Sequence, residues 1–120
     1  MSYAAKTLYA FGCYLVLIGL VLLTTPNLLL ALFHFPLTTE IWIRMVGMLA
    51  LFLSAYYFVS ARAELRPIFA CSVPVRVSMF IFCGGFVVLG LAPAVLMLFG
   101  LIDLAGAAWT WSALRQRAAA

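Results

Sequence analysis

The sequence has few charged side chains. Of 120 residues, seven are Lys or Arg, three are Asp or Glu and one is His, so that 8% are charged, whereas soluble domains carry about 25%. So few charges do not cover a water-facing surface, which excludes an ordinary soluble domain. They also do not form a groove that follows nucleic-acid phosphates, which excludes a nucleic-acid partner.

Residues that carry chemistry are equally scarce. Cys13, Cys71 and Cys83 have no Cys-x-x-Cys spacing, and no His or carboxylate lies at a ligand-like interval from them, so they predict neither a metal site nor a redox pair. The sequence shows no nucleophile beside a base. These absences favour a non-enzymatic protein with no catalytic residue, no metal and no cofactor.

What the sequence does have is long apolar tracts, with 68% hydrophobic residues and a mean hydropathy of +1.24. A helix needs about 20 apolar residues to cross a hydrocarbon layer about 30 Å thick. The tracts are interrupted at Pro26, after Arg62 and between Gly90 and Pro93, where helices are expected to end or begin. We therefore predict one all-α domain over residues 1–120, an integral membrane four-helix bundle. Its spans are expected near residues 6–25, 40–61, 74–90 and 93–114.

Two prolines and one short apolar segment refine this prediction. Pro74 is expected to open the third span after a connection at residues 70–73, and Pro93 the fourth, because proline suits the first turn of a helix. Residues 27–35 are too few to span and too apolar to lie in water. They predict a short helix in the outer headgroup layer or over the mouth of the bundle.

The basic residues predict the orientation, since Lys and Arg in short loops stay on the cytoplasmic side. Four spans place both termini on one side, and only Arg44 then lies towards the other. The remaining basic residues share the side of the termini: Lys6, Arg62, Arg66, Arg76, Arg115 and Arg117. We therefore predict a multi-pass protein of the bacterial inner (plasma) membrane with cytoplasmic N- and C-termini.

A buried polar centre is predicted around Asp103, which is expected near the middle of the bilayer. An ionised carboxylate there costs about 2.5 to 3.5 kcal/mol. Arg44, about one turn inside the second span, is the expected ion-pair partner. Glu40 competes for Arg44 because it lies four residues earlier on the same helix. In that case Asp103 is protonated or bonded to Thr110, Ser54 or a tyrosine.

Three further residues are candidates for contact with a ligand or a proton. His34 lies in the short apolar segment, and Tyr56 and Tyr57 lie near the inner end of the second span. The alternative for His34 is an interfacial side chain without a role. The alternative for the tyrosines is anchoring at the membrane interface.

Several sparse positions resemble a known group of proteins. They are Trp42-Ile43-Arg44-Met45-Val46-Gly47, Tyr56-Tyr57, Asp103-Leu104-Ala105-Gly106-Ala107 and Trp109-Thr110. This pattern resembles small bacterial four-helix inner-membrane proteins of the DoxX-like and BphX-like kind. The resemblance implies a membrane subunit or partner of an oxidoreductase system, and it implies no catalytic residue.

Three functions follow as hypotheses. The first is an accessory or scaffold subunit, with the lipid bilayer, other membrane subunits or a second copy as partners, in which Arg44 and Asp103 clamp helices together. The second is a small transporter, channel or lipophilic-ligand-binding protein that uses both residues inside the bundle, and it predicts a cavity that reaches Asp103. The third is a membrane-embedded enzyme, quinone or haem protein, which requires His34 beside a cofactor.

Overall fold

The computed structural model describes the backbone of residues 1–119 and the side chains of residues 1–116. This part of the chain is helical, in agreement with the predicted all-α class. Its helices are α1 (Tyr3–Thr24), α2 (Pro26–Leu32), α3 (Trp42–Arg62), α4 (Arg66–Val88) and α5 (Leu96–Ala119). The four long helices, α1, α3, α4 and α5, are long and apolar enough to cross a membrane.

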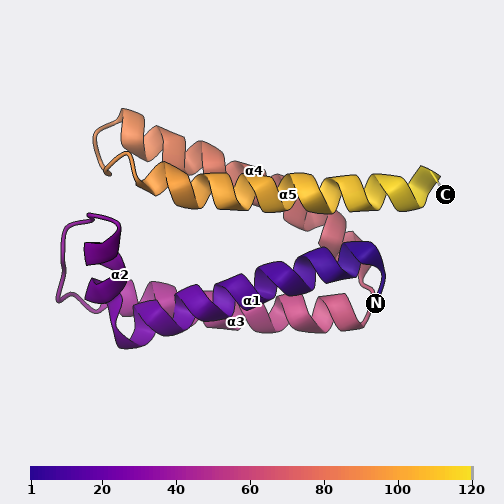
Figure 1. Ribbon diagram of the computed structural model, residues 1–120, viewed down its shortest axis with the longest axis horizontal. Helices are drawn as coiled ribbons and strands as arrows, with labels where there is room; N and C mark the ends of the chain where they lie inside the picture. The colour runs from indigo at the N-terminus through magenta and orange to yellow at the C-terminus, as the bar shows by residue number, and fades with distance from the viewer. Residues whose placement is uncertain (120) are drawn as a thin grey trace.

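The long helices form two pairs rather than an evenly packed bundle. α1 packs along α3 and α4 packs along α5, and the two pairs meet mainly through α1 and α5. Both termini and the α3–α4 connection lie at one end, here called the terminal end; α2 and the α4–α5 connection lie at the other, the loop end (Figure 1). The pairs diverge towards the loop end, in a molecule that measures 49 × 29 × 19 Å.

The α1–α3 contact is close because glycines face each other. A methyl group added to Gly47 would lie 2.7 Å from the Gly19 carbonyl oxygen, and one added to Gly19 would lie 2.9 Å from the Gly47 carbonyl oxygen. Small residues let helix backbones approach in lipid, where no hydrophobic effect drives association. This glycine pair therefore sets the spacing of the first helix pair.

Three helices end in the same motif, with one residue in the left-handed region. His34, Glu64 and Gly90 have φ of 59°, 54° and 74°. In each case the amide of the following residue donates to a carbonyl five residues before it, from Phe35 to Leu30, from Leu65 to Ser60 and from Leu91 to Phe86. This is the Schellman arrangement, whose left-handed position usually holds glycine.

The α3–α4 connection also caps α1. Ser2 is the N-cap of α1, and its hydroxyl accepts a hydrogen bond from the Ala5 amide. The Glu64 carboxylate accepts hydrogen bonds from the Ser2 amide and, at 2.7 Å, from the Ser2 hydroxyl. In a capping box the Glu comes from the helix itself; here it comes from a residue far along the chain.

The third long helix begins earlier than predicted. α4 starts at Arg66, so residues 70–73 are helical and do not form the expected connection. The physical reason is Pro67, which occupies the first turn and provides the start signal that we assigned to Pro74. Pro74 lies inside α4, where the surrounding protein and neighbouring polar side chains can satisfy a freed carbonyl in a membrane helix.

The loop end differs from the prediction in detail. The short helix is present as α2, and its Pro26 and Leu30 are buried. Leu30 packs with Leu22 and Ile43, so α2 covers the ends of α1 and α3. The fourth long helix begins at Leu96 rather than Pro93, after turns that include a Leu96 amide to Pro93 carbonyl bond of 3.0 Å.

Candidate ligand pocket beside Asp103

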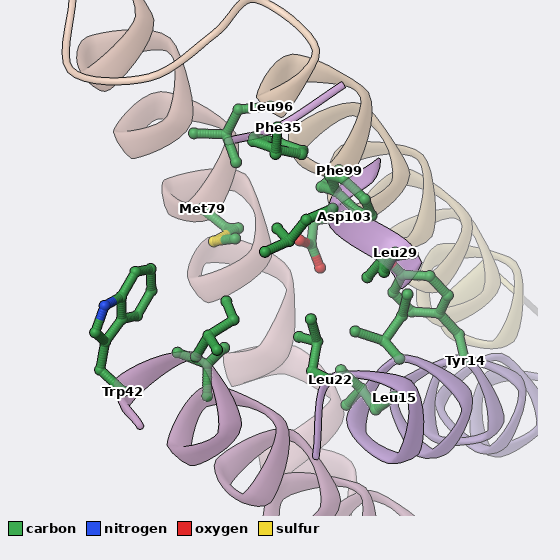
Figure 2. A pocket seen from close by; sticks show the side chains of 14 residues that line it. Tyr14, Leu15, Leu22, Leu29, Phe35, Trp42, Met79, Leu96, Phe99 and Asp103 are labelled. Carbon is green, nitrogen blue, oxygen red and sulfur yellow. The ribbon is translucent and has the colours of Figure 1, made fainter. Parts of the chain in front are cut away.

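Asp103 lies on α5 and lines a cavity between the two helix pairs. The cavity has a volume of about 330 Å³, and Asp103 is the one charged residue of its lining. Figure 2 shows the Asp103 carboxyl directed into the space between the helices. Pockets for small molecules have volumes of roughly 300 to 1,000 Å³ and are mostly apolar with a few placed polar groups. This cavity has that composition.

Every helix contributes to the wall, because the cavity fills the space that the diverging pairs leave open. Tyr14, Leu29, Trp42, Met79 and Phe99 come from α1 to α5 in that order. Aromatic rings are prominent among them. The ring of Phe35, in the connection after α2, lies 6.2 Å from that of Phe99.

The cavity opens between α3 and α4, which barely touch. Trp42 on α3 is 51% exposed and Met79 on α4 is 42% exposed, although both line the cavity. Figure 2 shows these two side chains on either side of the gap between their helices. The cavity is therefore open at the side of the molecule, between these two helices.

The Asp103 carboxyl has no hydrogen-bond donor among the side chains of residues 1–116. The cation that acts on it electrostatically is Arg76 of α4. Arg76 directs its N–H groups elsewhere: Nη2 donates to the Thr110 hydroxyl (2.7 Å) and the Ser72 hydroxyl (3.0 Å), and Nε donates to the Ser72 carbonyl (3.3 Å). Within the described side chains, Asp103 therefore has a nearby opposite charge and no hydrogen-bond donor.

Arg76 is the centre of a buried polar network in the terminal half of the molecule. It is 2% exposed, and its guanidinium lies 4.8 Å from the centre of the Phe11 ring. Thr110 also shares a 2.8 Å hydrogen bond with Thr7, whose hydroxyl lies 2.7 Å from the Ala4 carbonyl oxygen. The network joins α1, α4 and α5. Within the described side chains, Arg76 Nη1 is buried without a partner.

The predicted Arg44–Asp103 ion pair is not formed. Arg44 is exposed at the loop end, and its Nη1 donates to the carbonyls of Leu23 (2.6 Å) and Thr24 (3.3 Å). Its alternative partner Glu40 is exposed, and no ion pair joins the two within residues 1–116. The last carbonyls of a helix lack partners and carry partial negative charge. Arg44 therefore caps the end of α1, and the interior cation is Arg76.

The other members of the predicted polar centre are buried but do not contact Asp103. Ser54 donates to the Leu51 carbonyl of its own helix at 2.6 Å. Thr110 belongs to the Arg76 network. The prediction of interior polar groups on these helices holds, whereas the grouping around Asp103 does not.

The candidate contact residues lie apart from one another. Tyr57 is 6% exposed and interacts electrostatically with both Arg76 and Asp103. Tyr56, the preceding residue of α3, is 71% exposed. His34 is exposed at the end of α2. Only Tyr57 is near the interior charges.

Arg76 and Tyr14 are site residues that the sequence did not predict. A span that begins at Pro74 puts Arg76 at its cytoplasmic edge. With α4 beginning at Arg66, Arg76 lies in the third helical turn, within the apolar stretch. The available signal was the uncharged run after Pro67, together with Ser72 one turn before Arg76 on the same face.

The two arginines of the C-terminal tail differ in what the structure describes. The side chain of Arg115 lies at the terminal end, and the side chain of Arg117 lies outside the described residues.

Comparison with protein-family models, curated proteins and solved structures finds no match to this chain. The resemblance to DoxX-like and BphX-like proteins therefore stays a prediction. Among the described residues, no group of three or more His, Cys, Asp or Glu side chains gathers where it could hold a metal ion. The Asp103 cavity is the strongest candidate site on the described part of the chain.

Proposed function

We propose that this protein binds a lipophilic organic cation, a protonated amine on an apolar body, in the cavity beside Asp103. The observation that carries the proposal is a carboxyl group that has no donor among the side chains of residues 1–116, at the wall of an otherwise apolar cavity. Because the cavity opens between Trp42 and Met79, the ligand would enter from the lipid. The proposal agrees with the predicted lipophilic-ligand-binding protein in its use of Asp103. It differs in that Arg44 takes no part in the site.

Charge favours an amine. A buried carboxylate without a hydrogen-bonded partner is costly, and an ammonium group that donates to it removes much of that cost. Arg76 reduces the cost through its field but gives Asp103 no hydrogen bond. A ligand ammonium would supply that bond at the wall of the cavity.

The aromatic side chains that line the cavity also favour a lipophilic organic cation as the ligand. Tyr14, Phe35, Trp42 and Phe99 line the cavity with Asp103. The negative face of an aromatic ring attracts an organic cation, by about 0.5 to 2 kcal/mol per contact. The rings also bury the hydrocarbon part of a ligand, so both parts of a lipophilic amine have partners.

A pair of fluorescent probes tests the proposal. The protein is reconstituted in nanodiscs and titrated with a dansyl alkylamine and with the dansyl alcohol of the same chain length, with energy transfer from the tryptophans of the protein to the dansyl group as the signal. We expect the amine to bind at least about tenfold more tightly, a difference of about 1.4 kcal/mol, and Asp103→Asn to abolish that preference. Equal binding of amine and alcohol by the wild-type protein would refute the proposal.

We further propose that the terminal end faces the cytoplasm of a bacterial cell. Support comes from the basic residues Lys6, Arg62, Arg66 and Arg115, which lie in or beside the helix ends at the terminal end. Arg76 lies in the interior and does not count towards either end. The excess of basic residues at the terminal end remains, since Arg44 is the basic residue at the loop end. Cysteine labelling of intact cells and inverted vesicles at Ser2 and at Thr39 tests this orientation.

An accessory or scaffold subunit stays a prediction of the sequence. It requires other membrane subunits or a second copy as partners, and co-purification from native membranes tests it. The cavity favours ligand binding over a purely structural role, because a clamp between helices would place Asp103 in contact with a donor.

A further inference from the structure

A second cavity lies beside the first. It has a volume of about 200 Å³ and lies between α1 and α5 in the terminal half. Its lining consists of Thr7, Ala10, Phe11, Tyr14, Ile102, Gly106 and Trp109. Tyr14 lines both cavities, and Ile102 precedes Asp103 on α5. Because α1 and α5 are antiparallel, the two cavities follow one another along their contact.

The second cavity lies next to an unsatisfied positive group. Arg76 is 2% exposed, and its Nη1 is buried without an acceptor within the described residues. A methyl group added to Gly106 would come within 3.0 Å of that nitrogen, and within 3.2 Å of the Phe11 ring. Since Gly106 and Phe11 line the second cavity, Arg76 Nη1 lies directly behind its wall.

Two opposite charges are thus left incomplete, one at the wall of the first cavity and one behind the wall of the second. Within the described side chains, Asp103 lacks a donor and Arg76 Nη1 lacks an acceptor, although each acts on the other electrostatically. Asp103 and Gly106 are three residues apart on α5, which is about 4.5 Å along the helix axis. A ligand with a cation and an anion a few bonds apart would place its cation on Asp103 and its anion at the wall of the second cavity, within the field of Arg76.

We propose that the ligand is a zwitterionic amphiphile, with its ammonium group on Asp103 in the first cavity and an anionic oxygen group directed to Arg76 in the second. The inference rests on the proposed function and specifies its ligand. The hydrocarbon tail lies in the first cavity and leaves through the gap between α3 and α4. Tyr14 stands between the cavities, and its phenol is a further donor for the anionic group.

Competition against the dansyl alkylamine tests this inference. The competitors are dodecylamine, which carries the cation alone, and N-dodecyl-β-alanine, which adds a carboxylate two carbons from the nitrogen. We expect the zwitterion to compete at least about tenfold better in the wild-type protein, about 1.4 kcal/mol. Equal competition would overturn the inference while leaving the amine site intact. Absence of dansyl-amine binding would instead refute the proposed function.

Substitutions in the lining of the second cavity test whether the anionic group of the zwitterion binds there. Gly106→Ala places a methyl group against Arg76 Nη1, and Tyr14→Phe removes the phenol donor while keeping the ring. Both should reduce the advantage of the zwitterion over dodecylamine. Gly106→Ala, whose position lines the second cavity and not the first, should leave dodecylamine binding within about twofold. The matched control is Gly85→Ala, whose added methyl meets nothing within 4 Å. An unchanged zwitterion advantage in Gly106→Ala and in Tyr14→Phe would contradict the placement of the anionic group.

A membrane lipid headgroup and a free amphiphile share this chemistry. Nanodiscs of phosphatidylglycerol alone, and with added phosphatidylethanolamine, separate the two sources. Weaker binding of N-dodecyl-β-alanine in the presence of phosphatidylethanolamine would assign the site to the lipid. Unchanged binding would assign it to a free amphiphile.

Discussion

Arg76 and Asp103 interact across the α4–α5 contact without an ion pair. The guanidinium is held by Ser72 and Thr110 on the terminal side, and the carboxyl lines the cavity on the loop side. A structural clamp would bring the two groups into direct contact. Their separation leaves the carboxyl available to a ligand.

Asp103→Asn is expected to stabilise the protein while it abolishes the preference for the amine over the alcohol. A neutral amide in place of an unpaired carboxyl saves part of the cost of a charge in the membrane, of the order of 1 to 2 kcal/mol. Thermal unfolding in detergent without added ligand measures this change. A loss of stability would instead support the hypothesis of an interhelical clamp.

Thr110→Val is expected to destabilise the protein by about 2 to 3 kcal/mol, because it removes the buried hydroxyl that accepts a hydrogen bond from Arg76 and shares one with Thr7. Thr110→Ser keeps the hydroxyl and should retain most of the stability. Denaturant unfolding in micelles compares the two variants. Equal stability of both would show that the Arg76 network contributes little.

Gly47→Ala is expected to push α1 and α3 apart, because the new methyl group would lie 2.7 Å from the Gly19 carbonyl oxygen. Overpacking of this kind costs about 1 to 3 kcal/mol. Gly85→Ala should be stabilising by up to about 1 kcal/mol, since it faces open space in a helix. An unfolding temperature of Gly47→Ala equal to or above that of the wild-type protein would contradict the close glycine contact.

His34→Gly and Glu64→Gly are expected to have opposite effects, although both residues have left-handed φ. Glycine relieves a backbone cost of about 1 to 2 kcal/mol at either position. At Glu64 the substitution also removes the two hydrogen bonds to Ser2, so we expect a net loss of stability there and a gain at His34. A loss of stability in His34→Gly would contradict this expectation and would show that the His34 side chain makes a stabilising contact.

Hydropathy and helix punctuation predicted the architecture well, because both reflect local properties of the chain. The four long helices and the short α2 follow from apolar length and from Pro26. The start of α4 did not follow, since Pro67 and Pro74 both suit a first turn. Only tertiary packing shows that Pro74 is accommodated inside the helix.

The candidate site was predicted in part. Asp103 was identified because one carboxylate in a long apolar tract is conspicuous. The sequence predicted Arg44 as its charged neighbour. Helix spacing and depth in the membrane do not show that the free carbonyls at the end of α1 bind the Arg44 guanidinium instead. The cavity itself arises from the divergence of two helix pairs, and this is a tertiary property that no local pattern contains.

The bond between Glu64 and Ser2 has a consequence for synthesis of the chain. The first helix to leave the ribosome lacks part of its cap until the carboxylate that follows the third helix has been made. Until then the amino end of α1 frays more readily. Once Glu64, after α3, has been made, its carboxylate completes the cap of α1. Assembly of the first hairpin is thus coupled to the moment at which translation reaches the turn before α4.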